Sequence, residues 1–266
     1  KDMKIYSSEG ASLLERQQWA GITKEDLKVI LKPMVSEERD PLGSMGTDTP
    51  LAILSHKPQH LANYFSPLFA QVTNPPIDSI RERSVIAFTS RLGSSINILK
   101  ADESLAAFIY LDHPVLSHIE FSKIESLDHP DFKVGYLSTV YDLDRPYSLE
   151  SAINALCLTA EKLAHSGHTI LILSDTKITY GQAAIPSLMA TGAIHHHLIQ
   201  KALRSKTSLV IQAADVWESH HFALLFGYGA NAVHPYLAIE SVWMHDTSSL
   251  PHDHKDTEKK FIKGLE

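Results

Sequence analysis

The 266-residue chain is 44% hydrophobic, enough to bury one large core, and its 31 acidic and 24 basic residues give a formal net charge of -7. The basic residues form no stripe with interleaved aromatics, so we expect neither nucleic acid nor membrane as a partner. No apolar run approaches the roughly 20 residues that cross a bilayer, and the N-terminus does not resemble a signal peptide. The single cysteine, Cys157, permits no intrachain disulfide, so we expect a soluble intracellular protein.

The N-terminal part predicts one clear helix followed by a long irregular segment. Thr23 is a favourable cap for residues 24–34, in which apolar side chains recur at helical spacing, and we expect this helix to end near Pro33. Residues 33–76 are dense in proline and glycine, which interrupt regular structure repeatedly. Aromatic and leucine side chains at residues 64–69 nevertheless have helical spacing, which predicts a short helix packed on the body.

The second half alternates apolar runs with helical patterns. Strands are predicted near residues 134–141, 169–173, 208–211 and 232, and helices near residues 148–165, 185–204 and 216–226. Strands that are apolar throughout and separated by helices are typical of a parallel sheet buried on both faces.

We therefore predict an α/β fold with a parallel βα-repeat core, either TIM-barrel-like or open and doubly wound, since both are built from the same right-handed units. Residues 1–130 are predicted to form a helical and irregular arm. Residues 131–246 would be the βα core, and residues 247–266 a polar connector.

Three polar residues follow the predicted strands at the edge where parallel sheets bind ligands: Ser174, Asp175 and Gln212. Asp175 is the most interesting carboxylate of the chain, because it follows the apolar run TILILS. A capping or interface role competes with a catalytic one, because the sequence places no histidine or second acid beside it.

The 16 histidines raise the question of a metal site. Consecutive helical residues point about 100° apart, so the run His195, His196, His197 cannot chelate from one face. We expect one or two of these rings to pack or hydrogen-bond and the others to meet solvent. His252 and His254 could capture an adventitious Zn²⁺, but their polar context favours a solvated loop, and no metal site is predicted.

Two other features have structural interpretations. Cys157 lies on the apolar face of a predicted helix and is expected to be a buried small hydrophobe with a raised pKa, not a nucleophile. The run GYGANA partly matches a dinucleotide fingerprint, but it follows a helix and precedes a strand, which is the reverse of the required order. Gly227 or Gly229 is instead predicted to end the helix in a left-handed conformation.

Four stretches, in their order and spacing along nearly the whole chain, resemble the central domain of glutamate synthases. They are LKPMVSEERDPLGSMGTDTPLAILS from Leu31, FAQVTNPPIDSIRE from Phe69, ILILSD from Ile170 with IPSLMATGAIHHHLI from Ile185, and HHFALLFGYGANAVHPYLA from His220. The sequence departs from the family pattern at Thr47 and Gln212, where an acid is usual, at Ser79, where proline is common, and at His234, where asparagine is usual.

The resemblance implies a large subunit built from an amidotransferase with a terminal cysteine nucleophile, this central domain, an FMN-binding barrel with an iron-sulfur cluster, and a C-terminal domain. The complete enzyme would hydrolyse glutamine, pass ammonia through an internal tunnel and form L-glutamate from 2-oxoglutarate at the flavin. The expected partners are the amidotransferase and FMN-binding domains of the same polypeptide, and a small reductase subunit or ferredoxin. We expect a cytoplasmic or plastid-stromal location. The chain alone is expected to be inactive, without a cofactor or catalytic residues of its own.

The resemblance also implies that the QVTNPP segment forms part of the tunnel wall, with Thr73, Asn74, Pro75 and Pro76 as lining candidates. The two prolines fix φ near about -65° and restrict Asn74 to extended conformations, so the carbonyls before them are held in place. Neutral ammonia can donate hydrogen bonds to such carbonyls and to the Thr73 and Asn74 side chains. The alternative is that the prolines only shape a tight connection at a domain interface.

A rival hypothesis is a free-standing α/β ligand-binding or hydrolase-like domain that uses Asp175, Gln212 and His234 at its strand ends. The gene discriminates between the two, because a reading frame that continues on both sides of this sequence favours the fragment.

Overall fold

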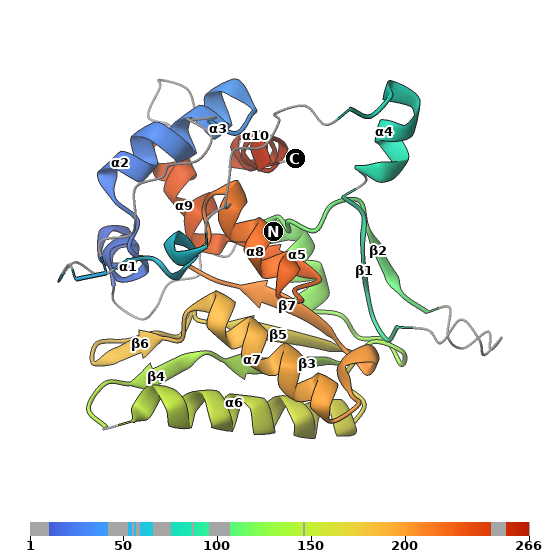
Figure 1. Ribbon diagram of the computed structural model, residues 1–266. Helices are drawn as coiled ribbons and strands as arrows, with labels where there is room; N and C mark the ends of the chain where they lie inside the picture. Colours follow the sequence, from blue (N-terminus) through green and yellow to red (C-terminus); the bar gives the residue numbers. More distant parts are fainter. Residues whose placement is uncertain are drawn as a thin grey trace.

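A parallel sheet of four apolar strands lies at the centre of the computed structural model (Figure 1). The structure describes residues 11–41, 53–54, 56, 59–65, 76–86, 88–95, 107–145, 147–245 and 254–265. The hydrogen-bonded order of the strands is β3 (Val134–Ser138), β5 (Ile170–Ser174), β7 (Ser208–Gln212) and β8 (Ala232–His234). The predicted α/β fold with a parallel βα-repeat core is therefore confirmed.

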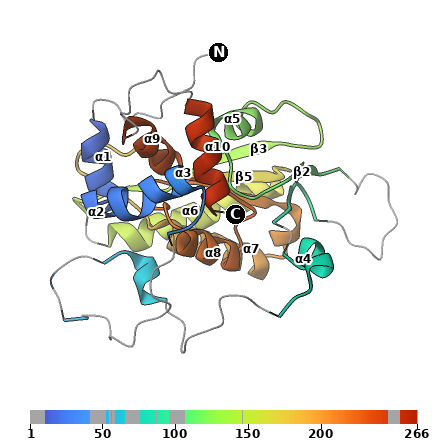
Figure 2. The ribbon, with the colours of Figure 1, turned by 90° about the horizontal axis from the view of Figure 1, so that it is seen from above.

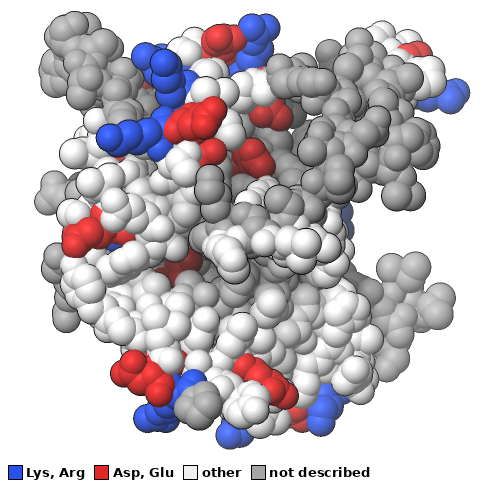
Figure 3. Space-filling model, turned by 60° about the vertical axis from the view of Figure 1, so that its left-hand side comes forward, with Lys and Arg blue, Asp and Glu red and all other residues white. Residues whose placement is uncertain are grey.

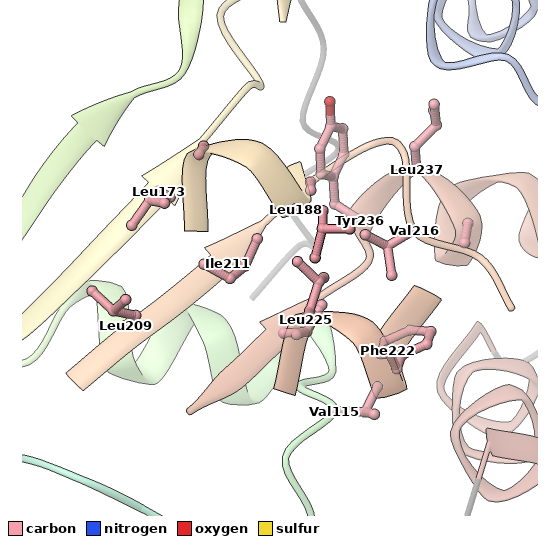
Figure 4. Packing of buried hydrophobic residues seen from close by; sticks show 14 of the residues in the cluster. Val115, Leu173, Leu188, Leu209, Ile211, Val216, Phe222, Leu225, Tyr236 and Leu237 are labelled. Atoms are coloured by element: carbon pink, nitrogen blue, oxygen red, sulfur yellow. The ribbon is translucent and has the colours of Figure 1, made fainter. Parts of the chain in front are cut away.

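Both faces of the sheet are covered, because successive side chains of each strand point to opposite sides. Leu171 and Leu173 of β5 join the larger core cluster. This cluster includes the buried sides of the three crossover helices α6 (Ser148–His165), α7 (Ser187–Gln200) and α8 (Ser219–Gly227). Ile170 and Ile172 join a second cluster with α5 (His118–Glu125) and with the antiparallel pair of β1 (Ser90–Leu92) and β2 (Ile109–Leu111). Figure 4 shows how side chains of α7 and α8 pack on Leu173, Leu209 and Ile211 of the sheet.

The strand order follows the chain order without reversal. Helix α6 packs on α7, and α7 packs on α8, so the crossover helices follow one another along one face. This is the arrangement of successive units in a βα-barrel, whereas a doubly wound sheet reverses its strand order at a switch point. Among the described strands of this sheet, β3 and β8 lie at opposite ends of the order, and Val115 forms a further parallel bridge with Val233 of β8.

The N-terminal helix does not end near Pro33, so that prediction was wrong. Three helical pieces follow one another: α2 (Lys24–Asp26), the π-helix Leu27–Leu31 and α3 (Lys32–Glu37), which stops at Glu38 with a φ of 51°. Pro33 lies in the first turn of α3, where its missing N–H is tolerated, and the preceding π turn changes the hydrogen-bonding pattern before it.

Three further helices pack against one another beside the sheet. Helix α1 (Leu13–Ala20) begins at a capping box between Ser12 and Glu15 and packs on α9 (Tyr236–His245). Helix α10 (His254–Leu265) lies within the predicted polar connector and packs against α3 and α9 (Figure 2). Its side chains Phe261 and Ile262 are buried. The remaining short elements are η2 (Leu61–Tyr64), α4 (Ser79–Val85), β4 (Val140–Asp142), β6 (Gln182–Ala184) and η4 (Arg204–Lys206). Within the described ranges, no helix has the length and apolar character needed to cross a membrane.

The end of α8 shows which glycine of GYGANA is required. Gly227 is the last helical residue, whereas Gly229 has a φ of 106°, so Gly229 is the one that adopts a positive φ. A Cβ at Gly229 would lie 2.1 Å from Nδ1 of His195, and this ring is held because its Nδ1 accepts a hydrogen bond from Nε of Arg204 at 2.9 Å. A Cβ at Gly227 would meet no atom of the described residues within 4 Å.

We predict that Gly229→Ala lowers the free energy of unfolding by about 2–4 kcal/mol, because it adds backbone strain and a steric clash. Gly227→Ala is the matched control and is expected to be neutral or to stabilise by up to about 1 kcal/mol, because alanine has the higher helix propensity. Urea denaturation of both variants measures the difference. Equal stabilities would contradict the assigned positions of the two glycines.

Candidate functional site

A cavity of about 470 Å³ opens at the carboxyl ends of the parallel strands. Its walls come from α1, the antiparallel pair of β4 and β6, the start of α7 and the residues that follow β5, β7 and β8. The lining residues are Arg16, Gln18, Trp19, Ala20, Gly21, Gln59, His60, Leu61, Asp175, Ile178, Gln182, Ala183, Ala184, Pro186, Ala214, Asp215 and Tyr236. Figure 3 shows the side of the molecule that carries α1, where charged side chains lie mostly above and below a hollowed middle.

Asp175 lies in this cavity immediately after β5 and is only 5% exposed. Its Oδ2 accepts a hydrogen bond from the backbone N–H of Ala214 at 2.9 Å, while Oδ1 is buried without a hydrogen-bond partner among the described residues. Burial, reinforced by the nearby charge of Asp215, raises the pKa of Asp175 to about 7. Hydrogen bonds from Ala214 and from the Tyr236 hydroxyl oppose this rise.

Asp215 is the second carboxylate of the cavity. Its Oδ2 accepts from the backbone N–H of Ser187 at 2.9 Å, and its carbonyl oxygen lies 2.9 Å from Nε2 of His60. Its Oδ1 is buried and also has no hydrogen-bond partner within the described part of the chain. Burial lowers the pKa of His60, with the charge of His221 as the next cause, which favours a neutral ring beside the two acids.

Tyr236 follows β8 and completes the polar end of the cavity. Its ring packs in the apolar core, and its hydroxyl points away from the aliphatic side chains (Figure 4). Burial raises the pKa of this phenol well above its ordinary value, and the charge of Asp175 adds to the rise. The phenol therefore keeps its proton at neutral pH and acts as a hydrogen-bond donor.

Helix α1 forms the opposite wall and is fixed to α9 by buried polar contacts. Nη1 of Arg16 donates to Oε2 of Glu240 at 2.6 Å, with both side chains less than 10% exposed. Nε2 of Gln17 donates to Oγ of Ser241 at 2.8 Å. The paired charges keep α1 over the strand ends, because breaking a buried ion pair leaves an uncompensated charge.

The sequence did not identify Asp215, Tyr236 or Arg16 as members of this site. Asp215 lies three residues beyond the last residue of β7 and Tyr236 two beyond that of β8. Asp215 and Tyr236 could have been identified from their positions just beyond two parallel strands. Arg16 gave none, because it comes from a helix distant in the sequence that was not predicted.

Gln212 and His234 do not line the cavity. Gln212 projects to the sheet face of Val210, where its Oε1 accepts from Oγ of Ser174 at 2.8 Å. His234 is fully buried against Phe121 of α5, with ring centroids 4.5 Å apart, and its Nδ1 lies 2.9 Å from the carbonyl oxygen of Leu116. The backbone of Asp175 is hydrogen-bonded to that of Gln212, but the side chains of Gln212 and His234 lie outside the cavity that Asp175 lines.

The tunnel candidates Thr73, Asn74 and Pro75 lie outside the described residues. Pro76 is described and exposed. Two residues later, Asp78 caps α4, because its Oδ1 accepts from the N–H groups of Ile80 at 3.0 Å and Arg81 at 2.9 Å.

The structure confirms the expected roles of the three consecutive histidines and the burial of Cys157, whereas His254, expected in a solvated loop, is the first residue of α10. His195 accepts from Arg204, Nε2 of His197 lies 2.7 Å from Oε2 of Glu161, and His196 is exposed. Cys157 is buried, and burial raises the pKa of its thiol. Within the described ranges, no group of three or more histidine, cysteine or acidic side chains could hold a metal ion.

The cavity has the chemistry of a binding site for a hydrogen-bond donor. The carboxylates of Asp175 and Asp215 in its wall accept hydrogen bonds, whereas Trp19, Ile178 and Pro186 add apolar surface. Its described lining contains no serine, threonine or cysteine that could act as a nucleophile.

Replacing Asp175 with Asn is predicted to stabilise the fold more at pH 8 than at pH 4. The pKa of Asp175 is about 7 in the folded chain, whereas the ordinary value of 3.8 applies to the unfolded chain. Between pH 3.8 and 7 the folded state therefore binds more protons than the unfolded state, and the free energy of unfolding falls as the pH rises through this range. A tenfold change in the acid constant corresponds to about 1.4 kcal/mol, so the gain from the substitution should reach a few kcal/mol above pH 7. Urea denaturation at both pH values measures it, with the exposed Asp144→Asn as control, and a pH-independent difference would contradict the assignment.

The comparisons with known proteins agree on one family. A family model described as the glutamate synthase central domain matches residues 15–266. The chain is 43% identical over 243 residues to ferredoxin-dependent glutamate synthase 2 of Synechocystis sp., covering 90% of this chain and 15% of that protein. It is 41% identical over 256 residues to the glutamate synthase [NADPH] large chain of Bacillus subtilis, covering 96% and 17%. It is 38% identical over 237 residues to the chloroplastic ferredoxin-dependent glutamate synthase of Spinacia oleracea, covering 88% and 14%. The chain belongs to the glutamate synthase central domain family.

Proposed function

We propose that this chain is the connecting domain of a glutamate synthase that forms L-glutamate from L-glutamine and 2-oxoglutarate with a reductant. One observation carries the proposal: the family match spans residues 15–266, whereas the chain spans only 15% and 17% of the two relatives named first. Most of such a polypeptide therefore lies outside this domain. In this proposal the domain joins the glutaminase and synthase sites and has no catalytic residues of its own.

The QVTNPP segment is where the domain would meet the reaction. Pro75 and Pro76 lack N–H donors and restrict the chain, so the carbonyls of Thr73 and Asn74 are available to accept hydrogen bonds. Neutral ammonia donates to such fixed dipoles weakly enough to move on, whereas a carboxylate would hold it as ammonium. This chemistry supports a role for the segment in the wall of an ammonia tunnel.

The redox cofactors of the family would be bound elsewhere in the polypeptide. An iron-sulfur cluster needs several thiolate ligands, and this chain has one cysteine, which is buried in α6. The residues present therefore do not fit the cluster. The names of relatives include ferredoxin-dependent, NADPH and NADH enzymes, so a ferredoxin or a reductase subunit remains an equal candidate for the electron donor.

A second candidate function is small-molecule binding at the strand ends, and the cavity around Asp175 favours it. This function is compatible with the first, because the cavity lies on the described body of the domain and the proposed tunnel segment is a separate stretch of sequence. Gln212 and His234, which lie away from the cavity, have no part in it.

In the complete polypeptide, Thr73→Val is predicted to uncouple glutamine hydrolysis from glutamate formation, because valine keeps the shape of threonine but cannot accept a hydrogen bond from ammonia. The ratio of glutamine consumed to glutamate formed from labelled 2-oxoglutarate measures the coupling. Thr159→Val, at an exposed position of α6, is the matched control. Unchanged coupling in the Thr73 variant would remove the tunnel role from this segment.

A further inference from the structure

We propose that the cavity at the strand ends binds a small primary amine, with the ammonium group held between Oδ1 of Asp175 and Oδ1 of Asp215. The inference uses residues other than those of the proposed tunnel segment, and it does not depend on the tunnel. It rests on two carboxylates that are fixed in position, each with one buried oxygen left unused.

The positions of both carboxylates are set by the backbone. Oδ2 of Asp175 accepts from Ala214 N–H, and Oδ2 of Asp215 accepts from Ser187 N–H, each at 2.9 Å. These contacts come from the loop after β7 and from the first residue of α7, so neither side chain is free to rotate toward solvent without losing a hydrogen bond.

The remaining oxygen of each carboxylate can accept a hydrogen bond from a ligand. Both Oδ1 atoms are buried and have no hydrogen-bond partner in the part of the chain that the structure describes, and Asp175 is only 5% exposed. A buried acceptor without a donor is destabilising, and native proteins satisfy nearly all such groups. Asp175 accepts its hydrogen bond from Ala214, the residue before Asp215, and both aspartates line the same cavity, so one ligand can lie against both carboxylates.

The ligand that fits is a cation with several N–H donors. Arg16 also lines the cavity, and its Nη1 is paired with Oε2 of Glu240 at 2.6 Å, so these two buried charges offset each other. Ca²⁺ and Mg²⁺ prefer six or more oxygen ligands. Among the described residues, no group of three or more acidic, histidine or cysteine side chains could hold a metal ion. A primary ammonium has three donors and can bridge two carboxylates with charge-assisted hydrogen bonds.

The rest of the cavity suits a short carbon chain on that ammonium. Its volume of about 470 Å³ lies in the range of small-molecule sites. Trp19, Leu61 and Ile178 provide apolar lining, while the amides of Gln18 and Gln59 could orient a polar group at the other end of the ligand. We therefore expect a small amine metabolite and not bare ammonium.

The test is calorimetric titration of the complete polypeptide with n-butylammonium chloride, with tetramethylammonium chloride at equal ionic strength as the reference. Butylammonium is expected to bind at one site, and tetramethylammonium, which has no N–H donor, is expected not to bind. Asp175→Asn and Asp215→Asn should each weaken butylammonium binding by about tenfold or more, because each removes a charge-assisted hydrogen bond. Asp144→Asn, an exposed carboxylate outside the cavity, should change it by less than about twofold.

The two cavity variants are expected to remain folded. In Asp175→Asn the amide oxygen can still accept from Ala214 N–H, and in Asp215→Asn the amide oxygen can still accept from Ser187 N–H. Thermal melts should therefore match or exceed those of the wild type, so that lost binding cannot be attributed to unfolding. Absence of butylammonium binding to the wild type, equal binding of tetramethylammonium, or a crystal soak that shows only ordered water between the two carboxylates would each overturn the proposal.

Discussion

The rest of the structure depends on one constraint: the residues that follow the parallel strands all lie at the carboxyl-terminal edge of the sheet. Because the strands are parallel, and β5, β7 and β8 are buried on both faces, the polar residues that follow them gather at one edge. Asp175, Asp215 and Tyr236 arrive there from three consecutive strands of the sheet. Helix α1, held by the buried pair of Arg16 and Glu240, then covers this edge incompletely and leaves a cavity with two acids in its wall.

The core was predictable from sequence because its strands are apolar without interruption. ILILS and SLVIQ have too little polar alternation to lie on a surface, and the helix over Ser148–His165 has an apolar face of full length. The short strands β1, β2 and β6 were missed, because strands of three residues carry little periodicity, and the single run predicted near residues 134–141 is divided into β3 and β4. The continuation of the N-terminal helix past Pro33 was missed because α3 is stabilised by packing on α10, a contact distant in the sequence.

The site was only partly predictable for a related reason. Asp175 could be named because it adjoins a strand, but its environment is set by Asp215, which the pairing of β5 with β7 brings near. Gln212 was also named from its strand-end position, yet the alternation of β7 turns it to the other face. A strand-end position therefore predicts the edge of the sheet at which a side chain lies. It does not predict which strand-end residues share a cavity.

This domain has two separate properties: it belongs to the glutamate synthase central domain family, and it contains an acidic cavity. The central claim is that the domain connects catalytic parts and performs no catalysis itself. The most direct measurement uses the purified 266-residue chain, shown to be folded by circular dichroism, in a glutamine hydrolysis assay and in equilibrium dialysis against FMN. The claim predicts no glutamine hydrolysis above the buffer rate and no stoichiometric FMN binding. Hydrolysis of glutamine by this chain, or one bound FMN per chain, would contradict it.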